Sequence, residues 1–273
     1  MPATRLATQR VEKPWGRHHL WPGFADPAPD AAPVGEVWFQ AEGDTRSELL
    51  VKYLFTSERL SVQVHPDDAA AQKAGYPRGK DEAWIVLAAE PDSTIALGLK
   101  HATTREHLRA AALDGSIEHL MDWRPVKAGD VIYSPAGTIH AIGAGITLVE
   151  IQQNVDLTYR LYDYGRPREL HLDAGLAVSD PMPFTPPTHV REAAPGRAIL
   201  TEGEKFVMER WTRPRSLTLP AGVEGWFVPL TGKGVIDGAA WEAGEAWAAT
   251  GEISVDFDGA EVLIAYPGAQ AIG

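Results

Sequence analysis

The sequence contains no cysteine. Disulfides, thiolate-bound metals and cysteine nucleophiles are therefore excluded together. No apolar run approaches the roughly 18 residues that a membrane-spanning helix needs. The first 16 residues, MPATRLATQRVEKPWG, also lack the apolar segment of a secretory signal. We therefore expect a cytoplasmic protein that has no membrane partner.

Positive charge is also in short supply. The chain has 25 Lys and Arg against 37 Asp and Glu, a formal net charge of −12, and no basic run of five residues. Such a field disfavours long-range attraction to nucleic acid or to an anionic membrane. A local basic cluster can still override it, so a small anionic substrate remains compatible with the composition.

Glycine and proline, in contrast, are abundant, with 26 and 21 residues spread along the chain. Between them lie short runs rich in Val, Ile, Leu, Trp and Tyr, whose length is typical of strands. These runs cover residues 36–40, 49–55, 59–65, 82–88, 130–135, 146–153, 225–232 and 260–267. Their spacing predicts a mainly β protein built as a sandwich or barrel.

Two segments interrupt the strand pattern, and a third divides the chain. Residues 66–76 are rich in alanine and begin with acidic residues, and residues 103–123 have helical apolar spacing that ends or breaks near Gly115. Both are predicted to be helices that decorate the β scaffold. The proline-rich segment 179–196 reads as a linker. We therefore expect a catalytic domain over residues 1–178 and a smaller domain, without histidine, over residues 197–273.

Polar side chains stand in the apolar stretch LSVQVHPDD. Gln63 and His65 are two residues apart, so in a strand they face the same side. Burying either without a partner would cost about 1–3 kcal/mol, although a half-exposed strand end would also satisfy them. In KDEAWIVL, Lys80 and Glu82 have the same spacing at the start of another apolar run. A solvated ion pair at a strand end is the alternative interpretation.

A third polar position follows a turn in GDVIYSPAGTIHAIG. The order Gly129, Pro135, Gly137 and His140 resembles the second signature motif of the cupin superfamily, a small β-barrel of jelly-roll type. Two features differ from that superfamily. Ala144 stands where an asparagine is common, and Gln63-Val64-His65 replaces the paired histidines of the first motif.

Together these three stretches supply a set of metal-ligand side chains. They are two imidazoles, one carboxylate and one amide, from His65, His140, Glu82 and Gln63. Three strong ligands with an open position are typical of catalytic zinc. Nitrogen and oxygen donors without sulfur also suit Mn, Fe, Co or Ni. The residues therefore predict a metal site and leave its metal open.

Four stretches of the sequence resemble the class I phosphomannose isomerases, also called mannose-6-phosphate isomerases, in their short bacterial form. They are LSVQVHPDD, KDEAW, SPAGTIHAIG and, most specifically, VEIQQNVDLTYRLYDYGRPRELHLDAGL over residues 149–176. The resemblance extends over about residues 11–178. It implies a cupin fold with a metal site in this part of the chain. Residues 197–273, which have a similar strand rhythm and no histidine, indicate a second cupin-like half without a metal site. The resemblance also implies a zinc-dependent aldose–ketose isomerase acting on a sugar phosphate.

The same resemblance implies roles for individual residues. Gln63, His65, Glu82 and His140 would hold one Zn²⁺ per chain, although Gln63 could instead orient a water or a sugar hydroxyl. Lys80, Glu150, Asp156 and Arg160 would form the catalytic set. Which of them is the base stays open, and a structural ion pair is the alternative for Asp156 and Arg160, as hydrogen bonding in a strand is for Glu150.

Alternatives to this function also stay open. The chain could isomerise another sugar or sugar phosphate, or it could be a non-catalytic, metal-containing sugar-binding cupin. We expect a monomer or a weak homo-oligomer that binds a small sugar phosphate and neither nucleic acid nor membrane. Trp15, Trp38 and Trp84 could line a sugar site, but large aromatic residues in strands more often belong to the core.

Overall fold

The computed structural model describes residues 3–21, 23–40, 47–186 and 190–273. The chain forms two compact units, which are described separately. Unit 1 comprises residues 1–12, 18–52 and 188–273, and unit 2 comprises residues 13–17 and 53–187. Strands β2 (Ala7–Arg17) and β4 (Leu49–Phe55) run from one unit into the other.

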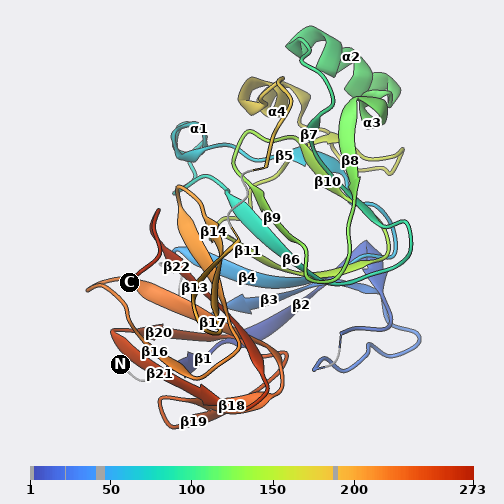
Figure 1. The fold of residues 1–273 in the computed structure, drawn as a ribbon. Coiled ribbons are helices and arrows are strands. Elements are labelled where there is room, and N and C mark those ends of the chain that lie inside the picture. The colour runs from blue at the N-terminus through green and yellow to red at the C-terminus, as the bar shows by residue number, and fades with distance from the viewer. Residues whose placement is uncertain (1–2, 22, 41–46, 187–189) are drawn as a thin grey trace. The chain divides into compact units, whose positions relative to one another are not determined.

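Unit 2 contains an antiparallel sheet of five strands in the order β12-β5-β10-β7-β8. Their bounds are β5 (Val62–Val64), β7 (Thr94–Leu99), β8 (Met121–Pro125), β10 (His140–Ile142) and β12 (Tyr159–Tyr162). Strands β5, β7, β8 and β10 of this sheet are labelled in Figure 1. Side chains alternate across this sheet. In β7, Ala96 packs on one side of the sheet with Leu108 of a helix, while Ile95 and Leu97 pack on the other side.

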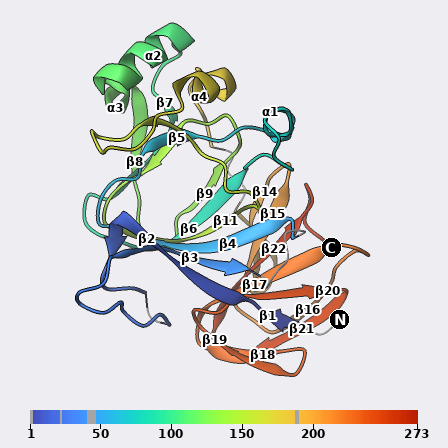
Figure 2. The ribbon, with the colours of Figure 1, turned by 180° about the vertical axis from the view of Figure 1, so that it is seen from behind.

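Four helices belong to unit 2: α1 (Asp68–Lys73), α2 (Arg105–Asp114), α3 (Ile117–Leu120) and α4 (Leu172–Val178). Helices α2, α3 and α4 gather beside the five-stranded sheet, as Figure 2 shows from behind. Asp67 caps α1 by accepting the Ala70 N–H, and Gly115 ends α2 in the left-handed conformation at φ 84°. The helices expected within residues 66–76 and 103–123 are therefore confirmed as far as Leu120. Residues 121–123, also expected to be helical, instead begin strand β8, and α4 had no prediction.

A second group of strands in unit 2 faces the first sheet. Strand β6 (Glu82–Ala89) pairs with β9 (Val131–Ser134) on one edge and with β11 (Ile146–Gln153) on the other. The apolar layer between the two groups includes Trp84, Val86, Ile95, Leu97 and Ile142. Glu82 and His140, two polar residues of the sequence motifs, are the first residues of β6 and β10, whose apolar residues Trp84 and Ile142 belong to this layer. The layer therefore helps to position the candidate functional site.

Unit 1 holds two antiparallel sheets, in the orders β1-β20-β17-β22-β15-β14-β13 and β16-β21-β18-β19. Their strands are β1 (Thr4–Arg5), β13 (Arg191–Ala194), β14 (Arg197–Glu202), β15 (Phe206–Trp211), β16 (Arg215–Thr218), β17 (Glu224–Thr231), β18 (Lys233–Ile236), β19 (Ala239–Glu242), β20 (Trp247–Thr250), β21 (Glu252–Phe257) and β22 (Glu261–Pro267). In β21, buried and exposed residues alternate throughout. One core cluster contains residues of both sheets, including Trp211, Phe227 and Val255.

The mainly β prediction is confirmed, and most predicted strands end within a residue or two of those observed. Strand β3 (Val34–Gln40) also lies where a strand is expected. The run 59–65 is the exception, since β5 covers only Val62–Val64. The boundaries at 178 and 197 stay a prediction: residues 18–52 group with the C-terminal part of the chain, β13 lies within the expected linker, and residues 187–189 of that linker are outside the described residues.

Candidate metal centre

Strand ends in unit 2 bring three ligand side chains together. Glu82 is the first residue of β6, His140 is the first of β10, and His65 directly follows β5. Each offers one ligand atom, and these atoms all lie within 4.8 Å of one another. The Nε2 atoms of His140 and His65 are 2.9 Å and 3.3 Å from Glu82 Oε1. All three residues are buried.

Backbone carbonyls determine which imidazole nitrogen faces the centre. His65 Nδ1 lies 2.9 Å from the Leu157 carbonyl oxygen, and His140 Nδ1 lies 2.9 Å from that of Thr138. Because a carbonyl only accepts hydrogen bonds, both Nδ1 atoms carry the proton. In the neutral rings, both Nε2 atoms then present a lone pair toward Glu82. Ring orientation by such outer partners is typical of histidines that bind metals.

In this arrangement the Nε2 atoms of His65 and His140 and the carboxylate oxygens of Glu82 are all hydrogen-bond acceptors. Neither carboxylate oxygen receives a hydrogen bond of ordinary geometry from the described residues, although both are buried. Two imidazole lone pairs and a carboxylate oxygen at this separation repel one another unless a cation lies among them. The Lys80 ammonium approaches Glu82 Oε2 and His65 Nε2, which leaves the 2.9 Å contact between Glu82 Oε1 and His140 Nε2 for a metal cation. The donor set, two nitrogens and one oxygen, fits a divalent metal such as Zn²⁺.

Lys80 places a positive charge beside this carboxylate. Its Nζ lies 2.8 Å from Glu82 Oε2 and 3.2 Å from His65 Nε2, and its side chain is buried. Burial by itself would raise the pKa of Glu82, but Lys80 and the two histidines outweigh burial and hold that pKa well below its ordinary value. Burial, with Lys80 nearby, lowers the pKa of His65 to about 3. At neutral pH the site therefore has a carboxylate and a neutral His65 imidazole, as metal binding requires.

Gln63 reaches the same centre by a weaker contact. Its Nε2 lies 3.2 Å from His140 Nε2, and Ser61 Oγ donates to its Oε1 at 3.3 Å. The backbone of Gln63 pairs with His140 on one side and with Arg160 on the other. Gln63 thus contacts His140, and its role as a metal ligand stays a prediction.

The four residues predicted for catalysis occupy different surroundings. Lys80 is at the centre itself, whereas Glu150 is buried on β11 and accepts the Trp84 indole N–H at 2.9 Å. Asp156 is exposed. Arg160 donates from Nη1 to the Glu169 carbonyl at 2.7 Å, while its buried Nε has no hydrogen-bond partner among the described residues. Burial and nearby arginines lower the pKa of Arg160.

Several sequence alternatives can be compared with this geometry. No hydrogen bond or ion pair links Asp156 with Arg160 in the described part of the chain. Trp84 is a core residue, since its ring is fully buried and packs 5.5 Å from the His140 ring. Trp15 is also buried in this core. The roles of the Leu157 and Thr138 carbonyls could not be predicted, because main-chain hydrogen-bond partners do not depend on residue type.

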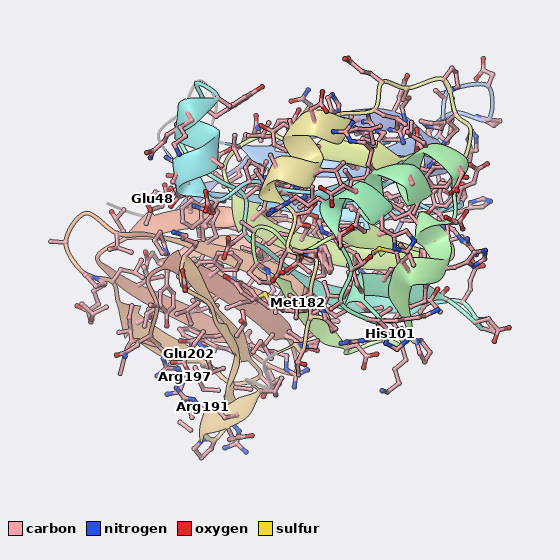
Figure 3. The ribbon with its side chains drawn as sticks, turned by 90° about the horizontal axis from the view of Figure 1, so that it is seen from above. Glu48, His101, Met182, Arg191, Arg197 and Glu202 are labelled. Atoms are coloured by element: carbon pink, nitrogen blue, oxygen red, sulfur yellow. The ribbon has the colours of Figure 1, made fainter. Side chains whose placement is uncertain are left out.

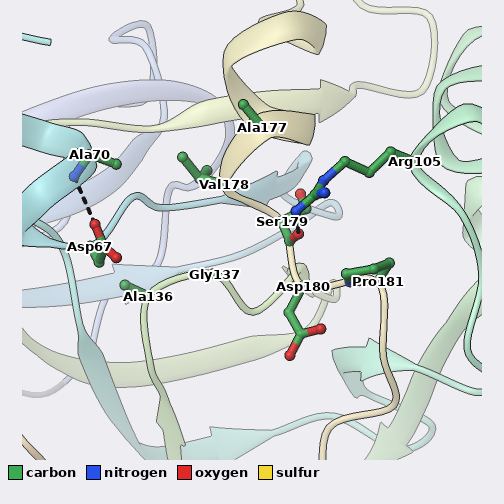
Figure 4. Close-up of a pocket in the computed structure, with 10 residues that line it drawn as sticks. All are labelled: Asp67, Ala70, Arg105, Ala136, Gly137, Ala177, Val178, Ser179, Asp180 and Pro181. Atoms are coloured by element: carbon green, nitrogen blue, oxygen red, sulfur yellow. Dashed lines mark hydrogen bonds between the residues drawn. The ribbon is translucent and has the colours of Figure 1, made fainter. Parts of the chain in front are cut away.

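A cavity of about 440 Å³ lies beside the loop that precedes His140 (Figure 4). Its walls include Asp67 and Ala70 at the start of α1, Gly137, Val178 and Arg105. The volume is in the range of small-molecule pockets. None of the metal-ligand candidates lines it. Arg105 uses its guanidinium on the Leu176 and Ser179 carbonyls, so we assign the cavity no ligand.

A mainly β fold with a buried cluster of two histidines and a glutamate defines a candidate metalloprotein of the cupin type. No protein-family model matches the chain. A curated relative, the mannose-6-phosphate isomerase ManA of Bacillus subtilis, is 39% identical over 191 residues, which are 66% of this chain and 60% of the relative. The chain covers 43% to 63% of the lengths of the curated relatives it matches.

Similarity of fold extends further than similarity of sequence. A crystal structure of mannose 6-phosphate isomerase from Bacillus subtilis superposes with a TM-score of 0.83 over 97% of this chain and 99% of that one, at 23% identity. A zinc-bound mannose 6-phosphate isomerase gives a TM-score of 0.75 at 13% identity, over 98% and 100% of the two chains. The predicted resemblance to the class I phosphomannose isomerases is confirmed, in sequence over much of the chain and in fold over nearly all of it.

Proposed function

We propose that this chain is an aldose–ketose isomerase that interconverts mannose 6-phosphate and fructose 6-phosphate. The observation that carries the proposal is the convergence of His65, Glu82 and His140, with both Nδ1 protons donated to carbonyls. The names of its relatives support the reaction and the substrate. The reaction moves a proton between C2 and C1 through a cis-enediol, so it needs a base and stabilisation of charge on the adjacent oxygens.

We further propose one Zn²⁺ per chain, held by His65, Glu82 and His140, with other divalent metals as possible substitutes. Gln63 either completes the set or orients a water or sugar hydroxyl. When bound, the metal supplies a Lewis acid for the carbonyl and hydroxyl oxygens of the sugar. The neutral His65 imidazole and the Glu82 carboxylate support this assignment, as does the zinc-bound enzyme of the same fold.

Lys80 is the proposed group that exchanges a proton with a sugar oxygen. Its Nζ contacts two of the ligand candidates directly, Glu82 and His65. Glu150 is proposed to hold Trp84 against His140 through the indole N–H. Asp156, being exposed, is proposed to act as a base only when substrate covers it.

Arg160 is proposed to face the negative charge of the substrate. Its strand pairs with the strand of Gln63, which places it near the metal centre. Arg166 and Arg168 are both engaged by the buried carboxylate of Asp163, at 2.7 Å and 2.5 Å. Their charge is therefore partly neutralised, whereas the buried Nε of Arg160 has no hydrogen-bond partner among the described residues. Such a group fits the phosphate or the developing enediolate.

The remaining sequence-based expectations stay predictions. They are a monomeric or weakly associated chain, a cytoplasmic location, and no nucleic-acid or membrane partner. Among the described helices, none combines the length and apolar character needed to cross a membrane.

Turnover by the purified, zinc-loaded full chain tests the proposed function. We expect conversion of mannose 6-phosphate, much weaker conversion of free mannose, and loss of both activity and bound zinc in His140→Ala. Comparable turnover of free mannose would point to another sugar as the substrate. A zinc-loaded chain that converts neither compound would overturn the proposal.

A further inference from the structure

Three charged residues in a row are buried where β6 begins. Lys80, Asp81 and Glu82 are 5%, 4% and 0% exposed. Alternation along the extended chain directs Lys80 and Glu82 toward each other, at 2.8 Å, and Asp81 toward the opposite side. The proposed reaction uses Lys80 and Glu82 and gives Asp81 no task. A buried carboxylate is costly unless donors surround it, so its partners show what it does.

Asp81 holds the segment that follows β9. The Tyr133 hydroxyl donates to its Oδ2, and the Ala136 N–H donates to its Oδ1 at 3.0 Å. Tyr133 belongs to β9, and Ala136 lies in the loop 135–139 between β9 and β10. The backbone of Asp81 is also fixed, because its N–H donates to Gln153 Oε1 and its carbonyl accepts the Gln153 N–H, both at 3.0 Å. Asp81 therefore joins β6, β9, β11 and the loop.

The loop 135–139 in turn supports both histidines. The Gly137 N–H donates to the His65 carbonyl at 2.8 Å, and the Thr138 carbonyl accepts the His140 Nδ1 proton at 2.9 Å. Asp81 is covalently next to Glu82. One side chain is thus linked, through a single loop and a single peptide bond, to all three ligand candidates.

We propose that Asp81 is a positioning residue that fixes the loop 135–139 so that His65 and His140 converge on Glu82. This inference rests on the proposed function insofar as it takes the cluster to be a metal site. Asp81 touches neither metal nor substrate in this account. Its role is exerted through the Ala136 and Tyr133 hydrogen bonds.

The substitution Asp81→Asn would keep the shape of the side chain and replace one of its two acceptor oxygens by an NH₂ group. If the NH₂ group faces the Ala136 N–H, two donors meet and that bond is lost. If it faces Tyr133, it can only donate to the hydroxyl oxygen, so the charge-assisted bond that Tyr133 donates to the carboxylate is replaced by a weaker neutral one. Loss of an outer partner of a metal site typically costs about 10–100-fold in metal affinity. We therefore expect Asp81→Asn to raise the zinc dissociation constant by about tenfold or more.

A buried carboxylate in unit 1 provides the matched control. Glu209 is fully buried, accepts the Tyr266 hydroxyl at 2.5 Å and the Trp211 indole N–H at 2.8 Å, and is paired with Arg197, which Figure 3 labels. Glu209→Gln reproduces the chemical change of Asp81→Asn at a site that contacts no ligand candidate. A general loss of stability would affect both variants, whereas a positioning effect is confined to Asp81.

The experiment measures zinc affinity of the full chain by competition with a chromophoric chelator. We expect weaker binding in Asp81→Asn, a smaller change in the same direction in Tyr133→Phe, and affinity within about twofold of the unmodified protein in Glu209→Gln. Saturating zinc should restore most of the kcat of Asp81→Asn. Unchanged affinity in Asp81→Asn, or an equal loss in Glu209→Gln, would overturn the inference.

Two further outcomes keep the inference separate from the proposed function. If Asp81→Asn does not fold, Tyr133→Phe decides, and unchanged affinity in that variant overturns the positioning role. An unmodified chain that binds zinc but leaves mannose 6-phosphate unchanged overturns only the proposed function. An active chain whose affinity is insensitive to position 81 overturns only the inference, and a chain that binds no zinc overturns both.

Discussion

His65 should make the stability of the metal-free protein depend on pH in a predictable direction. The fold favours its neutral form, because burial and Lys80 lower its pKa from 6.5 to about 3. Between these values the unfolded chain binds a proton that the folded chain does not, so stability rises with pH. The contribution of His65 to the free energy of unfolding is therefore complete above pH 6.5 and is lost as the pH falls from that value toward 3. At about 1.4 kcal/mol per pKa unit, the full interval corresponds to about 5 kcal/mol.

The matched perturbation is His65→Asn. Its amide NH₂ can still donate to the Leu157 carbonyl, as Nδ1 does at 2.9 Å, but it does not titrate. From pH 6 to pH 5, the chelated unmodified protein should lose about 1 kcal/mol more unfolding free energy than the variant. His101→Asn serves as the control for replacing a histidine at an exposed position, which Figure 3 labels.

Urea unfolding in the presence of chelator, at half-unit pH intervals from 7.5 to 5, measures the difference. Chelation is essential because metal binding also depends on pH. Equal pH slopes for the unmodified protein and His65→Asn would refute the argument, because they would mean that His65 titrates alike in the folded and unfolded chains.

Other perturbations test separate parts of the account. Lys80→Met should still bind zinc, because the substitution removes a positive charge from beside Glu82. If Lys80 moves a proton, the kcat of this variant should fall at least about a hundredfold. An unchanged kcat would exclude Lys80 from the mechanism. Glu150→Gln should keep an acceptor for the Trp84 indole and retain most activity, whereas a loss as large as that of Lys80→Met would make Glu150 the base. Gly79→Ala should destabilise by about 1–3 kcal/mol, because a Cβ there would lie 2.4 Å from the Asp67 carbonyl carbon; an unchanged urea midpoint would contradict this packing argument.

Much of the metal centre follows from short-range pattern. The spacing of Gln63 from His65 and of Lys80 from Glu82 places each pair on one side of a strand, and the pairs indeed meet in space. The proline and glycine turn before His140 likewise predicts a strand that starts at that residue, as β10 does. These signals are local, so a single sequence carries them.

The partners of the catalytic candidates could not be predicted in the same way. Asp163 neutralises Arg166 and Arg168 through a turn whose geometry depends on Tyr164 at φ 54°. The bond from Trp84 to Glu150 depends on the register between β6 and β11, which residue types do not specify. The role of Asp81 could not be predicted for another reason. Alternation marks the side of the strand that its carboxylate faces, but nothing in the sequence shows that the loop 135–139 lies there.

The most direct test of the central claim is to strip the chain of metal and then restore it. Purified protein should contain about one zinc per chain, lose both the zinc and turnover of mannose 6-phosphate on chelation, and regain both when one equivalent of Zn²⁺ is returned. Glu82→Ala should fail to regain either. Full turnover by the metal-free chain, or stoichiometric zinc in Glu82→Ala, would contradict the assignment of His65, Glu82 and His140 as the metal centre.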